Sequence, residues 1–209
     1  MCGRTLSTSG CRSAVLSLAN AASWPALNGK PTPEAVREEF LALWRPLLAA
    51  AAKADTGWTL RDFHSPNLMW QPDRDGIGRV GVLDFQDALL GPKAYDLVSL
   101  LQDARLDVPE PLEATLLDRY CSARAAQNQH FSSDDFRSLY ATLGAQRNSK
   151  ILGIFSRLAK RDGKRSYLAH IPRVAHYLER DLSHPDLADL RRWYMRELPA
   201  SAALPPLAL

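Results

Sequence analysis

The apolar positions of the first well-patterned segment recur at helical spacing. They lie on one face of a predicted helix and comprise Val36, Phe40, Leu43 and Leu47. The segment Thr32-Pro33-Glu34 is typical of a helix start, with a capping residue, a proline at the first helical position and an acid in the first turn. Pro46 lies inside the pattern, so we expect the helix to kink or end near its C-terminal turns.

After Gly57 the pattern changes to short apolar runs separated by polar loops. It predicts short strands at residues 58–61, 68–70 and 80–83. Residues 72–76 carry turn-forming side chains between the second and third strands. The sequence therefore predicts a small β-hairpin element between helices, with polar groups concentrated where the strands end.

From Lys93 onward the apolar spacing is again helical. It predicts helices that begin near Lys93, Pro109 and Ser132 or Ser133, and two more at residues 165–181 and 186–197. The predicted fold is therefore mainly α with a small β-hairpin element. We expect three tryptophans to serve its core rather than to stack on a sugar, namely Trp58, Trp70 and Trp193.

Composition narrows the class of protein. The 209 residues suit one domain, and 46% hydrophobic with 23% charged residues allow a packed core. A net charge of +3 without a dense basic run argues against a nucleic-acid partner. The longest apolar stretch is too short to span a membrane. Three scattered cysteines argue against a disulfide scaffold and a zinc site and favour a reducing, cytoplasmic location.

The two ends of the chain differ from its centre. Residues 1–31 contain no acidic residue, which fits either a targeting segment or an unstructured or misassigned N-terminus, and the second interpretation is favoured. Residues 32–198 are predicted to form the domain. Residues 199–209 are rich in Ala, Pro and Leu, and we expect them to be a flexible tail.

Three side chains suggest chemistry by their positions. Asp62 and Asn67 are five residues apart on one short loop, and Asp84 follows 17 residues after Asn67 at the end of an apolar strand. Each could be an ordinary turn former if it stood alone. Together they supply what phosphoryl transfer needs, a carboxylate for the acceptor hydroxyl and oxygen ligands for Mg²⁺ beside the nucleotide phosphates.

Two motifs in this region resemble a known family. The run Asp62-Phe63-His64-Ser65-Pro66-Asn67 resembles the D-x-H-x-x-N catalytic loop of aminoglycoside phosphotransferases and choline-kinase-like enzymes. The run from Leu83-Asp84-Phe85 through Gly91 to Asp96-Leu97 resembles their metal-binding segment. Among relatives, the two runs together are most similar to bacterial kinases of the cell-wall amino sugars N-acetylmuramate and N-acetylglucosamine.

The resemblance implies a role for five residues. Asp62 would be the catalytic base, and Asn67 and Asp84 would bind Mg²⁺, with ATP as the phosphoryl donor. Asp96 would be a buried support that hydrogen-bonds the catalytic loop, and His64 would brace that loop, although a metal-binding or general-base histidine is the alternative. These enzymes act on small molecules, so the partners implied are a sugar and a nucleotide.

The resemblance also implies a fold, the C-terminal lobe of a protein-kinase-like enzyme over roughly residues 33–198. Such a fold holds ATP with a glycine-rich loop and a strand lysine paired with a helix glutamate. Residues 1–58 contain no such loop, and Lys30 and Lys53 have no suitable context. We therefore expect the N-terminal lobe to be missing from this chain, and the chain alone to hold ATP poorly.

Four further residues are weaker candidates for substrate binding. Gln86 could contact substrate or cap a strand end, and Asp87 could be a second metal ligand or an exposed turn acid. Arg147 and Lys150 share a helix face and could bind a sugar carboxylate or a phosphate, but a solvated basic face is the alternative.

Three functional hypotheses remain. The first is an ATP-dependent sugar or aminoglycoside kinase. The second is a non-catalytic remnant that binds a ligand or a partner chain. The third is a metal-dependent hydrolase, which would need a further ligand or base, and only Asp87 or His64 is available for it.

Overall fold

The computed structural model describes residues 30–198. Most of the predictions for residues 1–31, and all those for residues 199–209, lie outside this range. Six α-helices are described: α3 (Glu34–Ala51), α4 (Ala94–Leu101), α5 (Glu110–Gln127), α6 (Ser133–Asp162), α7 (Ile171–Leu182) and α8 (Ala188–Glu197). The expectation of a mainly helical fold with a small β element is confirmed for the described residues.

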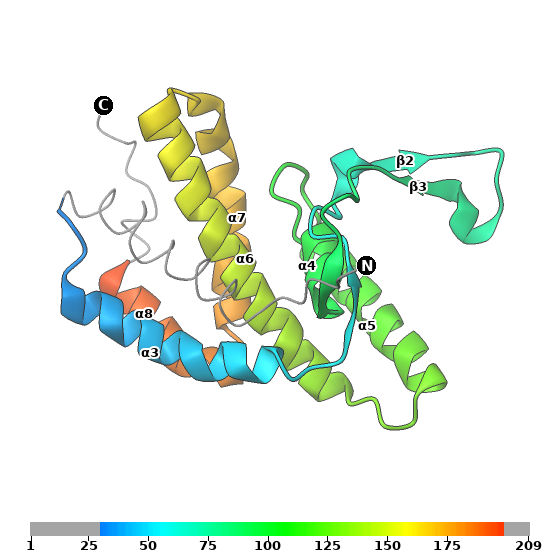
Figure 1. Ribbon diagram of the computed structural model, residues 1–209, viewed down its shortest axis with the longest axis horizontal. Coiled ribbons are helices and arrows are strands. Elements are labelled where there is room, and N and C mark those ends of the chain that lie inside the picture. The colour runs from blue at the N-terminus through cyan, green and yellow to red at the C-terminus, as the bar shows by residue number, and fades with distance from the viewer. Residues whose placement is uncertain (1–29, 199–209) are drawn as a thin grey trace.

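Four short strands form two antiparallel pairs. In one pair, β1 (Thr56–Thr59) lies beside β4 (Leu89–Pro92), with Trp58 opposite Leu90. In the other, β2 (Leu68–Trp70) and β3 (Val80–Val82) form the predicted hairpin. Figure 1 shows this β2–β3 hairpin extending away from the helices.

Several predicted boundaries need correction. The first helix begins at Glu34 with Pro33 as its N-cap, and it continues past Pro46 to Ala51 instead of ending there. The first strand lies two residues earlier than predicted, so that Leu60 and Arg61 belong to the following loop. The expected helix at residues 165–181 is a 3₁₀ segment, Arg165–His170, followed by α7. Strand β4 was not predicted, because its residues Leu89–Pro92 show no alternation of apolar and polar positions.

Helix α6 is the central element of the helical body (Figure 1). Ser132 caps its N-terminus by accepting a hydrogen bond from the Asp135 amide at 3.1 Å. Gly163 ends the helix in the left-handed region at φ 66°, which glycine adopts without steric cost. The length of α6 lets it contact α3, α4, α5 and α7, so it joins the separate apolar clusters into one body.

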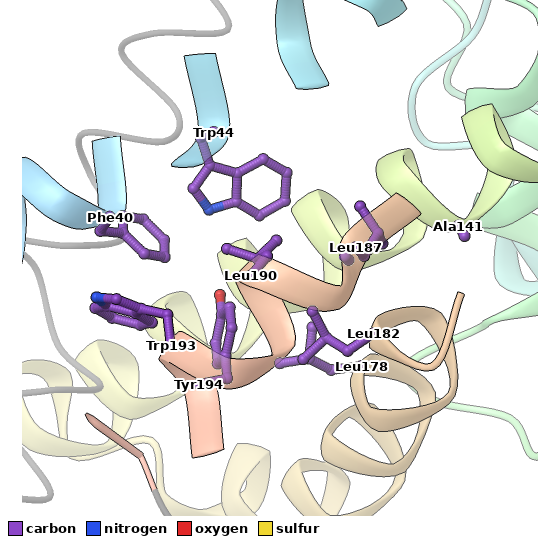
Figure 2. Close-up of a cluster of buried hydrophobic side chains, with 10 residues drawn as sticks. Phe40, Trp44, Ala141, Leu178, Leu182, Leu187, Leu190, Trp193 and Tyr194 are labelled. Carbon is purple, nitrogen blue, oxygen red and sulfur yellow. The ribbon is translucent and has the colours of Figure 1, made fainter. Parts of the chain in front are cut away.

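The largest apolar cluster joins α3 to α8 (Figure 2). Phe40 and Trp44 of α3 are buried, and the Phe40 ring lies 4.6 Å from the Trp193 ring of α8 between centroids. Burial of large aromatic side chains is a major source of stability. A second cluster joins α4, α5 and α6 through Val98, Leu117 and Leu143.

The expectation that three tryptophans serve the core is confirmed for one of them. Trp193 is 3% exposed, whereas Trp58 and Trp70 are 76% and 63% exposed. Both lie on the two-stranded pairs, which are too small to bury both of their faces. Over residues 30–198, no helix combines the length and apolar character needed to span a membrane.

Candidate active site

The loop between β1 and β2 carries Asp62 and Asn67 and is tightly wound. Arg61 adopts a positive φ of 70°, which is strained for a residue other than glycine. Short backbone hydrogen bonds follow, from the Asp62 amide to the Leu60 carbonyl (2.9 Å) and from the Asn67 amide to the His64 carbonyl (2.9 Å). This winding leaves the Asp62 side chain exposed to solvent, where a substrate can reach it.

Two carboxylates from the α4 segment hold this loop at both ends. Asp96 accepts hydrogen bonds from the amides of Leu60 (2.7 Å) and Arg61 (3.0 Å). Asp103 accepts one from the Ser65 amide (3.1 Å). Burial raises the pKa of Asp96, and the two amide donors act against that rise. The loop is therefore fixed at its entry by Asp96 and near its exit by Asp103.

Asp103 was missed by the sequence reasoning. It is fully buried and also accepts hydrogen bonds from the amides of Arg105 (2.8 Å) and Leu106 (3.4 Å). A signal was available, because Asp103 follows Asp96 by seven residues, about two helical turns, which is the spacing of one helix face. In the structure α4 ends at Leu101, so Asp103 lies just beyond the helix, and both acids take donors from the catalytic loop.

Asn67 and Asp84 meet at the base of the β2–β3 hairpin. The register pairs Leu68 with Val82, and the Leu83 amide donates to the Asn67 carbonyl at 2.9 Å. Asp84 follows with a positive φ of 55°, so the chain turns sharply as the third strand ends. The Asn67 side-chain amide donates to the Asp62 carbonyl at 2.9 Å. The hairpin thus brings Asp84 back to the loop that carries Asp62 and Asn67.

The donor chemistry at this point fits Mg²⁺. Residues 30–198 contain no group of three His, Cys, Asp or Glu side chains that could hold a metal ion by itself. Mg²⁺ commonly takes only one or two protein carboxylates and completes its shell with water and phosphate oxygens. The Asn67 side-chain nitrogen is engaged with the Asp62 carbonyl, which leaves its oxygen as an acceptor. The Asp84 carboxylate is exposed and accepts a hydrogen bond from Gln86. Asn67 and Asp84 are the residues that would hold the ion.

His64 lies half-buried in the same loop. Its buried Nδ1 has no hydrogen-bond partner among residues 30–198. His64 therefore does not brace the loop by a hydrogen bond through that atom. Burial, followed by the charge of Arg105, lowers the pKa of His64. The imidazole is therefore kept neutral at neutral pH.

The weaker candidates fall in different environments. Gln86 and Asp87 are exposed on the segment after β3, and Lys150 is half-buried on α6. Arg147 is only 7% exposed, so the alternative of a solvated basic face is wrong for this residue. Its Nη1 donates to the Gln102 carbonyl at the end of α4, at 3.5 Å, next to Asp103.

A buried polar network lies beneath the α4 segment and was not predicted. Gln102 donates to Asp181 at 2.8 Å and to Glu113 at 3.0 Å, and Asn148 donates to Asp181 at 2.9 Å. Glu113 also pairs with Arg180. Burial raises the pKa of Asp181 to about 7. No motif connects these residues, because they come from four helices far apart in the sequence.

Comparisons with known proteins match this chain to one family. A model described as the phosphotransferase enzyme family matches residues 13–132. An N-acetylmuramate/N-acetylglucosamine kinase of Caulobacter vibrioides is 45% identical over 161 residues, which cover 77% of this chain and 43% of the relative. A protein of the same name from Neisseria meningitidis is 48% identical over 122 residues, covering 57% of this chain and 35% of the relative.

A third relative of the same name, from Pseudomonas aeruginosa, is 37% identical over 159 residues, covering 73% of this chain and 46% of the relative. The chain thus spans less than half the length of each of these relatives. The family match, by contrast, covers more than half of this chain and includes both the loop with Asp62 and the hairpin with Asp84. The chain therefore belongs to the phosphotransferase enzyme family.

Proposed function

We propose that this chain is the acceptor- and metal-binding part of an ATP-dependent phosphotransferase that acts on a hydroxyl of an amino sugar. Asp62 is the catalytic base, and Asn67 and Asp84 are the Mg²⁺ ligands. Asp96 supports the loop, together with Asp103. The relatives' names motivate the choice of acceptor, since they are kinases of N-acetylmuramate and N-acetylglucosamine.

The observation that carries the proposal is the meeting of Asp62, Asn67 and Asp84. Asn67 is hydrogen-bonded to the Asp62 backbone, and the hairpin register brings Asp84 next to Asn67. The Asp62 carboxylate is thereby left for the acceptor. The Asp84 carboxylate and the Asn67 amide oxygen are left for a hard cation. This division of labour is what in-line phosphoryl transfer requires, since catalysis consists mainly of positioning and charge stabilisation.

In the proposed reaction, the Asp62 carboxylate accepts the proton of the sugar hydroxyl. The sugar oxygen forms a bond to the γ-phosphorus of ATP, the bond from that phosphorus to the β,γ-bridging oxygen breaks, and ADP leaves. Mg²⁺ held by Asn67 and Asp84 would neutralise phosphate charge. The use of ATP places the proposed reaction in the cytoplasm.

We expect slow turnover by the 209-residue chain on its own. ATP-clamping elements of the kinase type, a glycine-rich loop with a paired lysine and glutamate, are not found in its sequence. In this proposal the N-terminal lobe of a complete kinase would supply them. A non-catalytic remnant that only binds a ligand or a partner chain is the alternative.

The test compares Asp62→Asn with Asp73→Asn, a matched change at an exposed acid in the hairpin turn. Each protein is incubated with Mg²⁺, ATP and N-acetylglucosamine or N-acetylmuramate, and sugar phosphate is followed by ³¹P NMR. We expect Asp62→Asn to lower the rate by about 10²-fold or more, since general-base catalysis contributes about that much. Asp73→Asn should leave the rate unchanged.

A second readout does not depend on turnover. Mn²⁺ can replace Mg²⁺, and its binding in the presence of ATP is measured by electron paramagnetic resonance. We expect Asp84→Asn to weaken Mn²⁺ binding and Asp73→Asn to leave it unchanged. Normal transfer by Asp62→Asn would remove Asp62 as the base. Binding of sugar and Mn²⁺ by a chain that transfers no phosphate would favour the remnant.

A further inference from the structure

One buried and one partly buried arginine lie in the helical body, Arg147 and Arg180, and they differ in their partners. Arg180 of α7 forms a salt bridge with Glu113 of α5. Arg147 of α6 forms no salt bridge with any acidic side chain of residues 30–198. Every Asp and Glu of the chain lies between Glu34 and Glu197, within that range. No Asp or Glu side chain of this chain therefore forms a salt bridge with Arg147 in the structure.

The guanidinium of Arg147 also has spare hydrogen-bonding capacity. It carries five N–H donors, and among the described residues its hydrogen bond is the 3.5 Å contact from Nη1 to the Gln102 carbonyl. The side chain is 7% exposed, and burial lowers the pKa of Arg147. A buried charge whose donors are mostly unused is costly to retain unless a ligand pairs with them.

The surroundings of Arg147 place its guanidinium beside the catalytic loop. The groups that act most strongly on it are the Tyr95 hydroxyl and the carboxylates of Asp103 and Asp62. Arg147 Nη1 donates to the Gln102 carbonyl, next to Asp103, and the Asp103 carboxylate accepts the Ser65 amide of the loop. The guanidinium therefore lies on the α4 side of the loop that carries Asp62.

We infer that Arg147 forms an anion subsite beside the loop that carries Asp62 and that this subsite binds a carboxylate carried by the sugar. The inference rests on the proposed function. The fork of N–H donors in a guanidinium matches a carboxylate in a bidentate manner. The relatives are named for two sugars that differ in this group. N-acetylmuramate carries a carboxylate on its ether substituent, and N-acetylglucosamine lacks it. Arg147 is thus the residue that distinguishes a sugar acid from the neutral sugar.

The first experiment changes the ligand and leaves the protein unchanged. The affinities of the 209-residue chain for N-acetylmuramate, for its carboxamide and for N-acetylglucosamine are measured by isothermal titration calorimetry. We expect the carboxylate form to bind about tenfold tighter than the carboxamide, as a charged hydrogen-bonded pair predicts. Equal affinities for the acid and its amide would overturn the inference while leaving a sugar-binding function intact.

The second experiment changes Arg147. Arg147→Gln should lose about tenfold in affinity for N-acetylmuramate, while its affinity for N-acetylglucosamine stays within about twofold. Arg147→Lys should recover part of the lost affinity, because lysine keeps the positive charge but lacks the paired N–H donors of the guanidinium. The control is Arg157→Gln, at an exposed position of the same helix. Thermal melting checks folding, and if Arg147→Gln does not fold, the acid–amide comparison decides.

The remaining outcomes separate the inference from the proposed function. An equal loss for both sugars in Arg147→Gln would make Arg147 a structural residue and overturn the subsite. If Arg147→Gln lost affinity for ATP but kept its sugar selectivity, Arg147 would bind the donor phosphates. That result would also overturn the sugar-carboxylate subsite. Failure of the unaltered chain to bind either sugar would overturn the proposed sugar function itself.

Discussion

The helical body and the face that carries the candidate site differ in how completely they are packed. In the body, Phe40, Trp44 and Trp193 are at most 3% exposed and pack against one another. On the site face, large apolar side chains stay in contact with solvent: Trp58, Met69, Trp70, Ile77, Val80, Leu83, Phe85 and Leu90. The body is thus closed by its own residues, whereas the strands beside the site contribute little core of their own.

The charged groups divide in the same way. In the body, Glu113 is paired with Arg180 and bonded to Tyr140 at 2.8 Å, and Asp181 accepts two amide donors. At the site, the carboxylates of Asp62 and Asp84 are exposed. Buried polar groups need partners, whereas reactive groups must stay available. The described residues thus form a helical body whose buried carboxylates have partners. On one face of that body they expose the carboxylates proposed to take part in the reaction.

The largest expected effect compares two tryptophans. Trp44→Ala removes a fully buried ring and should lower the free energy of unfolding by about 3–5 kcal/mol, because it leaves a cavity in the α3–α8 cluster. Trp58→Ala removes a ring that is 76% exposed and should alter the free energy of unfolding by less than about 0.5 kcal/mol. Chemical denaturation followed by circular dichroism measures both.

A stability loss in Trp58→Ala as large as that in Trp44→Ala would contradict the comparison. It would mean that the site face contributes to folding as much as the helical body does. The paired design needs no further control, since both variants replace the same side chain by alanine.

A second expected effect concerns the buried carboxyl of Asp181. Because its pKa is raised to about 7, the folded state binds more protons than the unfolded state between pH of about 4 and 7. The stabilising contribution is therefore fully present at the acid end of this window and is lost as the pH rises through about 7. The free energy of unfolding, relative to that of Asp181→Asn, should fall by about 2 kcal/mol from pH 5 to pH 7.

Denaturant titrations of both proteins at several pH values measure this difference. Other carboxylates titrate equally in the two proteins, so the comparison isolates Asp181. The matched control is Asp186→Asn, at an exposed acid at the start of the 3₁₀ turn Pro185–Leu187. A relative stability that stays flat from pH 5 to pH 7 would show that the Asp181 carboxyl has an ordinary pKa.

The helical body was largely predictable from the sequence, and the site was predictable in part. Apolar periodicity located the helices from Phe40 to Trp193, because a helix that packs on a core repeats its pattern locally. Loop chemistry and strand ends singled out Asp62, Asn67 and Asp84 as one set. Strand β4 and the partners of Asp103 depend on contacts between distant segments, which no local pattern records. Arg147 was noticed as a basic residue, but its burial against the end of α4 is set by packing.

The smallest expected effect concerns the two carboxylates that hold the catalytic loop. Asp103 accepts the Ser65 amide, and Asp96 accepts the Leu60 and Arg61 amides. Asp103→Ala removes the acceptor and should speed hydrogen exchange of the Ser65 amide by up to about tenfold, the effect of losing one hydrogen bond. The exchange of the Leu60 and Arg61 amides should not change. NMR-detected hydrogen exchange measures each amide separately.

Asp96→Ala is the reciprocal test, because it removes both acceptor oxygens and should release the Leu60 and Arg61 amides and spare that of Ser65. A control at an exposed acid, Asp107→Ala, should change none of the three. If either aspartate variant released all three amides together, the loop would open as one unit, and the two carboxylates would not be separate anchors. Separate release would mean that the position of Asp62 is fixed from one end by Asp96 and that of Asn67 from the other by Asp103.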